Sequence, residues 1–148
     1  MFDGIGIETI GGILVVIAGG KLTPLNCYVG LGAGSGDGVE LAQPYGSLGC
    51  EYDVERLRFF VEHLSSPASG SDSPGFNHAG VKYIFPVAPF TAYLGGSFAL
   101  SSDQNNMGNL TGIVGVETNG DVRLYVEHVH SLTDFDASYT VSGVKFVF

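Results

Sequence analysis

The sequence predicts an all-β protein: an eight-stranded antiparallel up-and-down barrel built from two tandem four-stranded repeats, with an N-terminal apolar arm. Three observations lead to this prediction. Residues 24–85 recur with variation as residues 89–148. Short runs rich in Val, Tyr, Phe, Ile and Thr lie between Gly and Pro clusters, which is the strand signal, and helical periodicity is absent beyond residue 24. Long and short connectors alternate along the chain, as they do in up-and-down barrels.

The repeat covers whole halves of the chain. Residues 58–63 (RFFVEH) return as 123–128 (RLYVEH), and both halves close on a GVK phrase followed by an aromatic, an aliphatic and an aromatic residue. Two copies of a unit that cannot bury its own surface must associate, and a four-stranded half with open edges would aggregate. We therefore expect one barrel domain. The expected parts are an arm at 1–23 and a barrel at 24–148, with repeat 1 at 24–85 and repeat 2 at 89–148.

The connectors predict how the eight strands are joined. The Asn119-Gly120 pair is the strongest two-residue hairpin signal, because both residues tolerate positive φ. Tight turns are expected near 53–56, 86–89 and 118–121, and longer connectors near 34–44, 66–76, 101–109 and 132–138. The tight turns then lie at one end of the barrel and the longer loops at the other. The strands are predicted near 26–33, 45–52, 57–65, 77–85, 90–99, 110–117, 122–130 and 139–148.

The first twenty residues have no recognisable signal peptide. Asp3 and Glu8 stand where a secretory signal carries Lys or Arg. The uncharged run at 9–20 is too short for a transmembrane helix, which needs about 20 residues. Two interpretations of this arm stay open: a strand or short helix packed on the barrel, or an arm that docks on a partner or a membrane.

The composition limits the kinds of partner. A net charge of -9 with only six Lys and Arg excludes a nucleic-acid role, because phosphate binding needs clustered basic residues. Only 14% of the residues are charged, whereas ordinary domains have about a quarter. Such a surface suits a membrane or burial against other subunits. We therefore expect lipid or neighbouring protein subunits as partners, the latter in a homo-oligomer or a larger assembly.

The scarce charges recur at matching positions of the two repeats. Side chains alternate across a strand, so Arg58 and Glu62 share one face while Phe59 and Val61 share the other. In a membrane barrel the charged face fills the interior and the apolar face meets lipid; in a soluble barrel the faces are reversed. The low overall charge favours the membrane form. The expected paired polar face consists of Arg58, Glu62, Lys82, Arg123, Glu127 and Lys145, with Glu51 and Glu117 as further matching acids.

The two cysteines are predicted to lie opposite each other. If strands 26–33 and 45–52 form a hairpin, Cys27 and Cys50 become cross-strand neighbours, close enough for a disulfide. A reduced, packed thiol pair is the alternative. A disulfide would indicate an oxidising compartment or an extracellular particle.

A pair of side chains two residues apart, His63 and Ser65, is the candidate for catalysis. Both lie on one face of a strand, so the imidazole can take the hydroxyl proton during ester attack. With the strand count, the length and the aromatic final strand, this His-x-Ser pair resembles the PagL family of outer-membrane lipid A deacylases. The resemblance implies an esterase with His63 and Ser65 as catalytic residues and a Glu that orients the histidine.

The sequence departs from the PagL pattern at two places. No Glu stands on the following predicted strand, and the second copy of the motif reads His128-Val129-His130, with His130 in the place of the serine. His128 and His130 share a face but supply only two ligands, whereas a zinc site needs three or four. We therefore expect no metal site and no cofactor.

Three hypotheses for function follow. The first is a small non-catalytic barrel with a structural or membrane-associated role of the outer-membrane type. The second is a soluble barrel subunit of a larger assembly such as a virus particle, which docks through its N-terminal arm. The third is a lipid A deacylase-like esterase. The expected location is accordingly the outer membrane or a virus particle.

Overall fold

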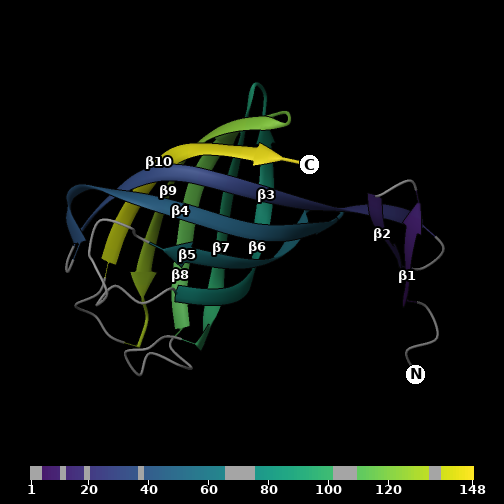
Figure 1. Ribbon diagram of the computed structural model, residues 1–148, viewed down its shortest axis with the longest axis horizontal. Helices are drawn as coiled ribbons and strands as arrows, with labels where there is room; N and C mark the ends of the chain where they lie inside the picture. The colour runs from purple at the N-terminus through teal and green to yellow at the C-terminus, as the bar shows by residue number, and fades with distance from the viewer. Residues whose placement is uncertain are drawn as a thin grey trace.

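Eight antiparallel strands close into a barrel in the computed structural model of the chain (Figure 1). The structure describes residues 5–10, 13–18, 21–36, 39–65, 76–101, 110–133 and 138–148, and the side chains of 25–34, 44–65, 77–100, 110–133 and 138–148. The barrel strands are β3 (Lys21–Gly36), β4 (Val39–Val54), β5 (Leu57–Ser65), β6 (Phe76–Val87), β7 (Phe90–Ser101), β8 (Leu110–Thr118), β9 (Val122–Ser131) and β10 (Ser138–Val147).

Each barrel strand pairs with its neighbours in the chain, and β10 pairs with β3 from Tyr139↔Gly36 to Val147↔Tyr28. This last pairing closes the barrel, so its strands have no open edge between them. The predicted eight-stranded antiparallel barrel is therefore confirmed. In the described part of the chain, no helix is long and apolar enough to cross a membrane.

One predicted connector is wrong. Residues 34–44 were expected as a long loop, but β3 continues to Gly36 and β4 begins at Val39, and a register shift falls between Gly34 and Gly36. The reason is that strand pairing uses backbone groups, which glycines supply as well as other residues do. The connectors expected at 66–76 and 101–109 lie almost wholly outside the described residues.

The N-terminal segment forms a β-hairpin. Strands β1 (Ile5–Ile10) and β2 (Ile13–Ala18) pair with each other, and β2 pairs with the first four residues of β3, 21–24. Figure 1 shows this hairpin beyond the barrel, at the end where β10 also finishes. The expected strand is thus present, whereas the alternative of a short helix is wrong. The hairpin pairs with the first residues of β3 instead of packing on the barrel wall.

The three tight turns lie at the end of the barrel where β3 enters. They occupy Glu55-Arg56, Ala88-Pro89 and 119–121. Gly120 has φ of 108°, a conformation that only glycine adopts without strain. Asn119 ties two of the turns together, because its Nδ2 donates to Pro89 O and its Oδ1 accepts from Thr91 Oγ1. This end of the barrel is therefore held by side-chain bonds between turns.

Two inward glycines make room for the largest buried rings. Gly49 is the cross-strand partner of Tyr28, and Gly115 is the partner of Tyr93. A Cβ at Gly49 would lie 2.5 Å from Tyr28 Oη, and one at Gly115 would lie 2.5 Å from Tyr93 Oη. Each tyrosine thus lies across a position that has no side chain, which packs the interior and brings the phenol groups toward the barrel axis.

The cysteines are cross-strand partners in β3 and β4, and a disulfide joins Cys27 to Cys50. Both residues lie on the outward face of the barrel. Cys27 also exchanges backbone hydrogen bonds with Phe148, with N···O distances of 3.1 and 2.9 Å. The disulfide is therefore next to the seam where the last strand meets the first.

We predict that changing both cysteines to serine lowers the free energy of unfolding by about 3 kcal/mol, because the disulfide restricts the unfolded chain over a separation of 23 residues. Urea titration of the refolded barrel, followed by circular dichroism, measures the loss. Reductant should destabilise the wild type by the same amount and leave the double variant unchanged. A wild-type unfolding midpoint that does not respond to reductant would contradict the prediction.

Candidate functional site: a charged interior and an apolar outer face

Strand β5 shows which face of the barrel wall is inside. Arg58, Phe60 and Glu62 are buried, while Phe59 and Val61 between them are each almost half exposed. The same alternation holds in β9, where Tyr125 and Glu127 are buried and Leu124 and Val126 are exposed. The charged face therefore lines the interior and the apolar face points outward. This arrangement is the reverse of a soluble barrel.

Two arginines and two glutamates form a closed ring in the interior near the tight turns. Arg58 Nη1 donates to Glu117 Oε1 at 2.5 Å and lies 3.5 Å from Glu51 Oε2. Arg123 Nη1 donates to Glu51 Oε1 at 2.5 Å and lies 3.2 Å from Glu117 Oε1. The remaining nitrogens of Arg58 reach Asp53, with Nε and Nη2 at 2.8 and 3.0 Å from its two oxygens. Each guanidinium thus meets both glutamates.

A second set of charges lies further along the barrel. Lys82 Nζ donates to Glu127 Oε2 at 2.6 Å, and Tyr93 Oη donates to the same oxygen at 2.8 Å. Within residues 24–85, Tyr28 Oη likewise donates to Glu62 Oε2 at 2.6 Å. Glu62 and Glu127 therefore each accept a hydrogen bond from a tyrosine hydroxyl, which offsets part of their loss of hydration.

Aromatic rings hold the two lysines in place. Lys82 Nζ lies 4.6 Å from the ring centroid of Phe60 and 4.4 Å from that of Tyr93. Lys145 Nζ lies 4.7 and 4.5 Å from the centroids of Tyr28 and Tyr125. A cation over an aromatic face is attracted by the ring quadrupole, and more strongly where water is absent. Both ammonium groups are thus stabilised by rings as well as by carboxylates.

The ion pairs join the two halves of the chain. Lys82 of the first half meets Glu127 of the second, and Lys145 of the second lies 4.0 Å from Glu62 of the first. Positions that the sequence repeat matches therefore make corresponding contacts with the opposite half. The charges of the two sets also balance, with four cations and four carboxylates: Arg58, Lys82, Arg123 and Lys145 against Glu51, Glu62, Glu117 and Glu127.

A buried polar chain that was not predicted from the sequence centres on His78, a histidine that only the first repeat contains. His78 is fully buried, with Nε2 3.0 Å from Glu62 Oε1 and Nδ1 3.0 Å from Ser97 Oγ. Ser97 in turn hydrogen-bonds Thr111 at 2.5 Å. The position that matches His78 in the second repeat is Val141, which is also buried. His78 and Lys82 are an even number of residues apart, so they share a face of the strand. This spacing could have indicated that His78 is buried, but only once the inner face was known.

Apolar side chains occupy the part of the interior nearest the longer connectors. Leu64, Ala99, Ile113, Val129 and Val141 are all buried there. Together with the tyrosines and the ion pairs, they form a series of buried side chains from the tight-turn end toward these connectors.

The candidate catalytic residues lie on the outward face. His63 and Ser65 are both partly buried near the end of β5, and His63 Nδ1 is 2.8 Å from Asn77 Oδ1 on the adjacent strand. Asn77 thus stands beside the histidine, where the PagL pattern would have an orienting Glu. A role for this pair in ester hydrolysis stays a prediction.

Two further histidines lie on the outward face of β9. His128 Nδ1 is 3.0 Å from Thr140 Oγ1, and the ring centroids of His128 and His130 are 6.4 Å apart. Ser131, by contrast, is buried on the inward face.

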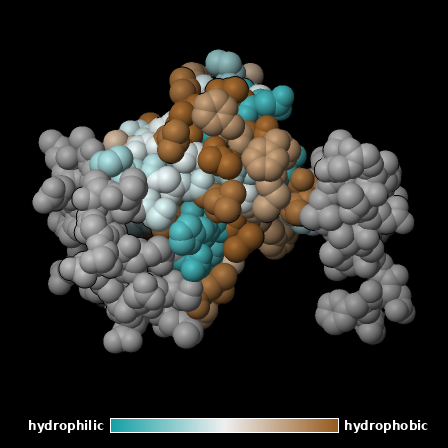
Figure 2. All heavy atoms as spheres, in the orientation of Figure 1, coloured by the Kyte–Doolittle hydropathy of each residue, from teal (hydrophilic) through white to brown (hydrophobic). Residues whose placement is uncertain are grey.

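The outer face of the barrel is apolar. Figure 2 shows hydrophobic side chains spread over the visible wall. Among the residues of β3 to β10 whose side chains the structure describes, no outward side chain is Asp, Glu, Lys or Arg. Every barrel strand contributes at least one exposed large apolar residue, and one from each is Leu31, Leu48, Val61, Val81, Leu94, Val114, Leu124 and Phe146.

These features define a class: a closed eight-stranded antiparallel barrel with an ion-paired interior and an apolar exterior. The fold is similar to that in the crystal structure of Neisserial surface protein A (NspA), with a TM-score of 0.50 and 15% sequence identity over 83% of this chain and 94% of that one. At this identity the similarity is one of fold. No protein-family model and no curated protein matches the chain, and the resemblance to the PagL family stays a prediction.

We predict that Glu127→Leu lowers the free energy of unfolding by about 3–5 kcal/mol, because it leaves the Lys82 ammonium buried without its carboxylate. Adding Lys82→Met should restore more than half of the loss, since the pair is then replaced by apolar side chains. Urea titration of the refolded barrel measures both variants.

The control is Asp121→Asn, at an exposed turn residue, for which a change within about 0.5 kcal/mol is expected. If the double variant were less stable than Glu127→Leu alone, the stability would not depend on pairing the buried charge.

Proposed function

We propose that this protein is a membrane-spanning barrel of the outer-membrane type with a structural, non-catalytic role. The observation that carries the proposal is the absence of charged side chains from the described outward strand positions. In water, this surface would be costly, at about 25 cal/mol for each Å² of exposed apolar area. In contact with lipid chains, the same surface costs nothing, and the interior charges are already paired.

The connections between the strands support the same proposal. Turns of two or three residues follow β4, β6 and β8. At the opposite end, ten residues separate β5 from β6, eight separate β7 from β8 and six separate β9 from β10, and the two residues between β3 and β4 are the exception. Short turns at one end and longer loops at the other, with an even strand number, are typical of outer-membrane barrels. The chain also shares its fold with NspA, which is by name a surface protein.

The interior favours a structural role over transport. Buried ion pairs, tyrosines and apolar side chains lie along its length, and a small barrel filled by side chains has no aqueous path. The proposed function therefore depends on the barrel wall itself and on the molecules that the loops and the outer face contact. The outer membrane is the corresponding proposed location.

We predict that Val114→Arg and Val122→Arg differ in their effect on insertion. Val114 is the central residue of β8 and half exposed, while Val122 is the first residue of β9 beside a tight turn. An arginine at the bilayer midplane costs about 2–4 kcal/mol and near the interface about 0–1 kcal/mol. Urea titration of protein refolded into phospholipid vesicles should show this difference.

The same preparation tests the soluble alternative, a barrel whose outer face is covered by other subunits of an assembly. Wild-type protein that stays monodisperse without detergent, lipid or partner would refute the membrane proposal. Equal losses from the two arginine variants would also count against it, because depth would then have no effect.

The esterase hypothesis has its own test, since His63 and Asn77 form a hydrogen bond on the outward face beside Ser65. For a non-catalytic barrel we predict that refolded wild type and Ser65→Ala release fatty acid from lipid A at the same background rate. Mass spectrometry of the released fatty acid measures the rate. A wild-type rate clearly above that of Ser65→Ala would show catalysis and refute the non-catalytic role.

A further inference from the structure

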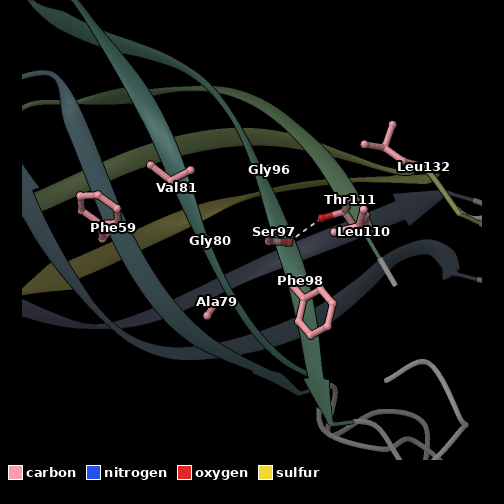
Figure 3. Close-up of a pocket in the computed structure, with 10 residues that line it drawn as sticks. All are labelled: Phe59, Ala79, Gly80, Val81, Gly96, Ser97, Phe98, Leu110, Thr111 and Leu132. Carbon is pink, nitrogen blue, oxygen red and sulfur yellow. Dashed lines mark hydrogen bonds between the residues drawn. The ribbon is translucent and has the colours of Figure 1, made fainter. Parts of the chain in front are cut away.

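A groove with a defined lining lies in the apolar outer face. It has a volume of about 470 Å³ and runs over strands β5 to β8. Figure 3 shows its floor at Ala79, Gly80 and Gly96, where side chains are small or absent, and the larger side chains of Phe59 and Phe98 near it. Leu110 and Leu132 complete the wall on the β8 side.

The groove leads obliquely from the middle of the barrel wall toward the loop end. The strand pairing places Val81, Gly96, Gly112 and His130 in one row across β6 to β9. Gly96 lies near the middle of β7, Gly112 is the third residue of β8, and His130 is the last but one of β9. We call the apolar outer face of the barrel the apolar belt. The row therefore runs from the centre of this belt to its polar edge at the loop end.

Hydrogen-bonding side chains gather where this row reaches the loop end. His130 pairs in register with Ser138, and His128 Nδ1 lies 3.0 Å from Thr140 Oγ1 on the same outward face. Imidazole and hydroxyl groups donate hydrogen bonds to phosphate oxygens. The row thus has a polar end that suits a phosphate and an apolar groove that suits a hydrocarbon chain.

We propose that this face binds a phosphate-bearing membrane lipid, with one acyl chain in the groove and the phosphate against His130, the histidine nearer the loop end. The proposal rests on the membrane-spanning function, because the groove is continuous with the apolar belt that we assign to lipid. A hollow in that belt is filled by hydrocarbon whenever the protein does not fill it. His130, which follows Gly96 and Gly112 in the same row, makes a phospholipid with an accessible phosphate the favoured occupant.

Two outward glycines provide a matched test. A Cβ at Gly112 would come no closer than 3.8 Å to a neighbour, which is Leu132 of the groove wall. A Cβ at Gly46 on β4, away from the groove, would likewise come no closer than 3.8 Å, to Ser65. Phenylalanine at either position therefore adds the same outward side chain without forcing the backbone, but only Gly112→Phe obstructs the groove.

The experiment is native mass spectrometry of the barrel released from detergent micelles that contain phosphatidylglycerol. The wild type and Gly46→Phe should each retain one lipid, and Gly112→Phe should bind it at least about tenfold more weakly. The variant His130→Ala should lose the preference for phosphatidylglycerol over diacylglycerol, which has no phosphate. Equal retention by the wild type and Gly112→Phe would overturn the site.

Insertion into vesicles is measured for the same four proteins, so that failure of the site and failure of the proposed function are distinguishable. Insertion of all four with equal lipid retention refutes only the lipid site. A wild type that does not insert refutes the membrane function itself. A wild-type dimer that is lost in Gly112→Phe would assign the groove to a second copy of the chain and overturn the lipid proposal.

Discussion

The structure depends on the pairing of buried charges across the barrel. A buried charge without a partner costs several kcal/mol, so the interior can close only if every cation reaches a carboxylate. Lys82 reaches Glu127 and Arg123 reaches Glu51, in each case in the opposite half of the chain. Each arginine also contacts a carboxylate of its own half, whereas the carboxylate paired with Lys82 comes from the other half. The pairing of β10 with β3 therefore closes the backbone ladder and also brings these groups together.

The apolar exterior follows from the charged interior. Because side chains alternate along a strand, placing Arg58 and Glu62 inside places Phe59 and Val61 outside. The barrel then needs a surrounding that accepts hydrocarbon. For the same reason the groove at Gly80 and Gly96 matters for function, since a hollow in such a surface is a place where the surrounding lipid contacts the protein most closely.

The strand pattern was accessible from the sequence, but some local features were not. Strong alternation and turn residues predicted all eight barrel strands, and the Asn119-Gly120 turn lies where it was expected. The connector expected at 34–44 is largely strand, because its glycines can join a ladder through the backbone alone. The His78 chain was missed because its partners, Glu62 and Ser97, come from different strands.

By itself, the sequence determined which residues share a face of each strand and which charges recur in the two repeats. Polar and apolar side chains alternate along each strand whichever face is inside, so the alternation could not show which face lines the interior. Only the tertiary structure decided that, because closure brings Arg58 within 2.5 Å of Glu117, 59 residues away. Such contacts depend on the relative heights of strands around the barrel, and no pattern local to one strand contains that information.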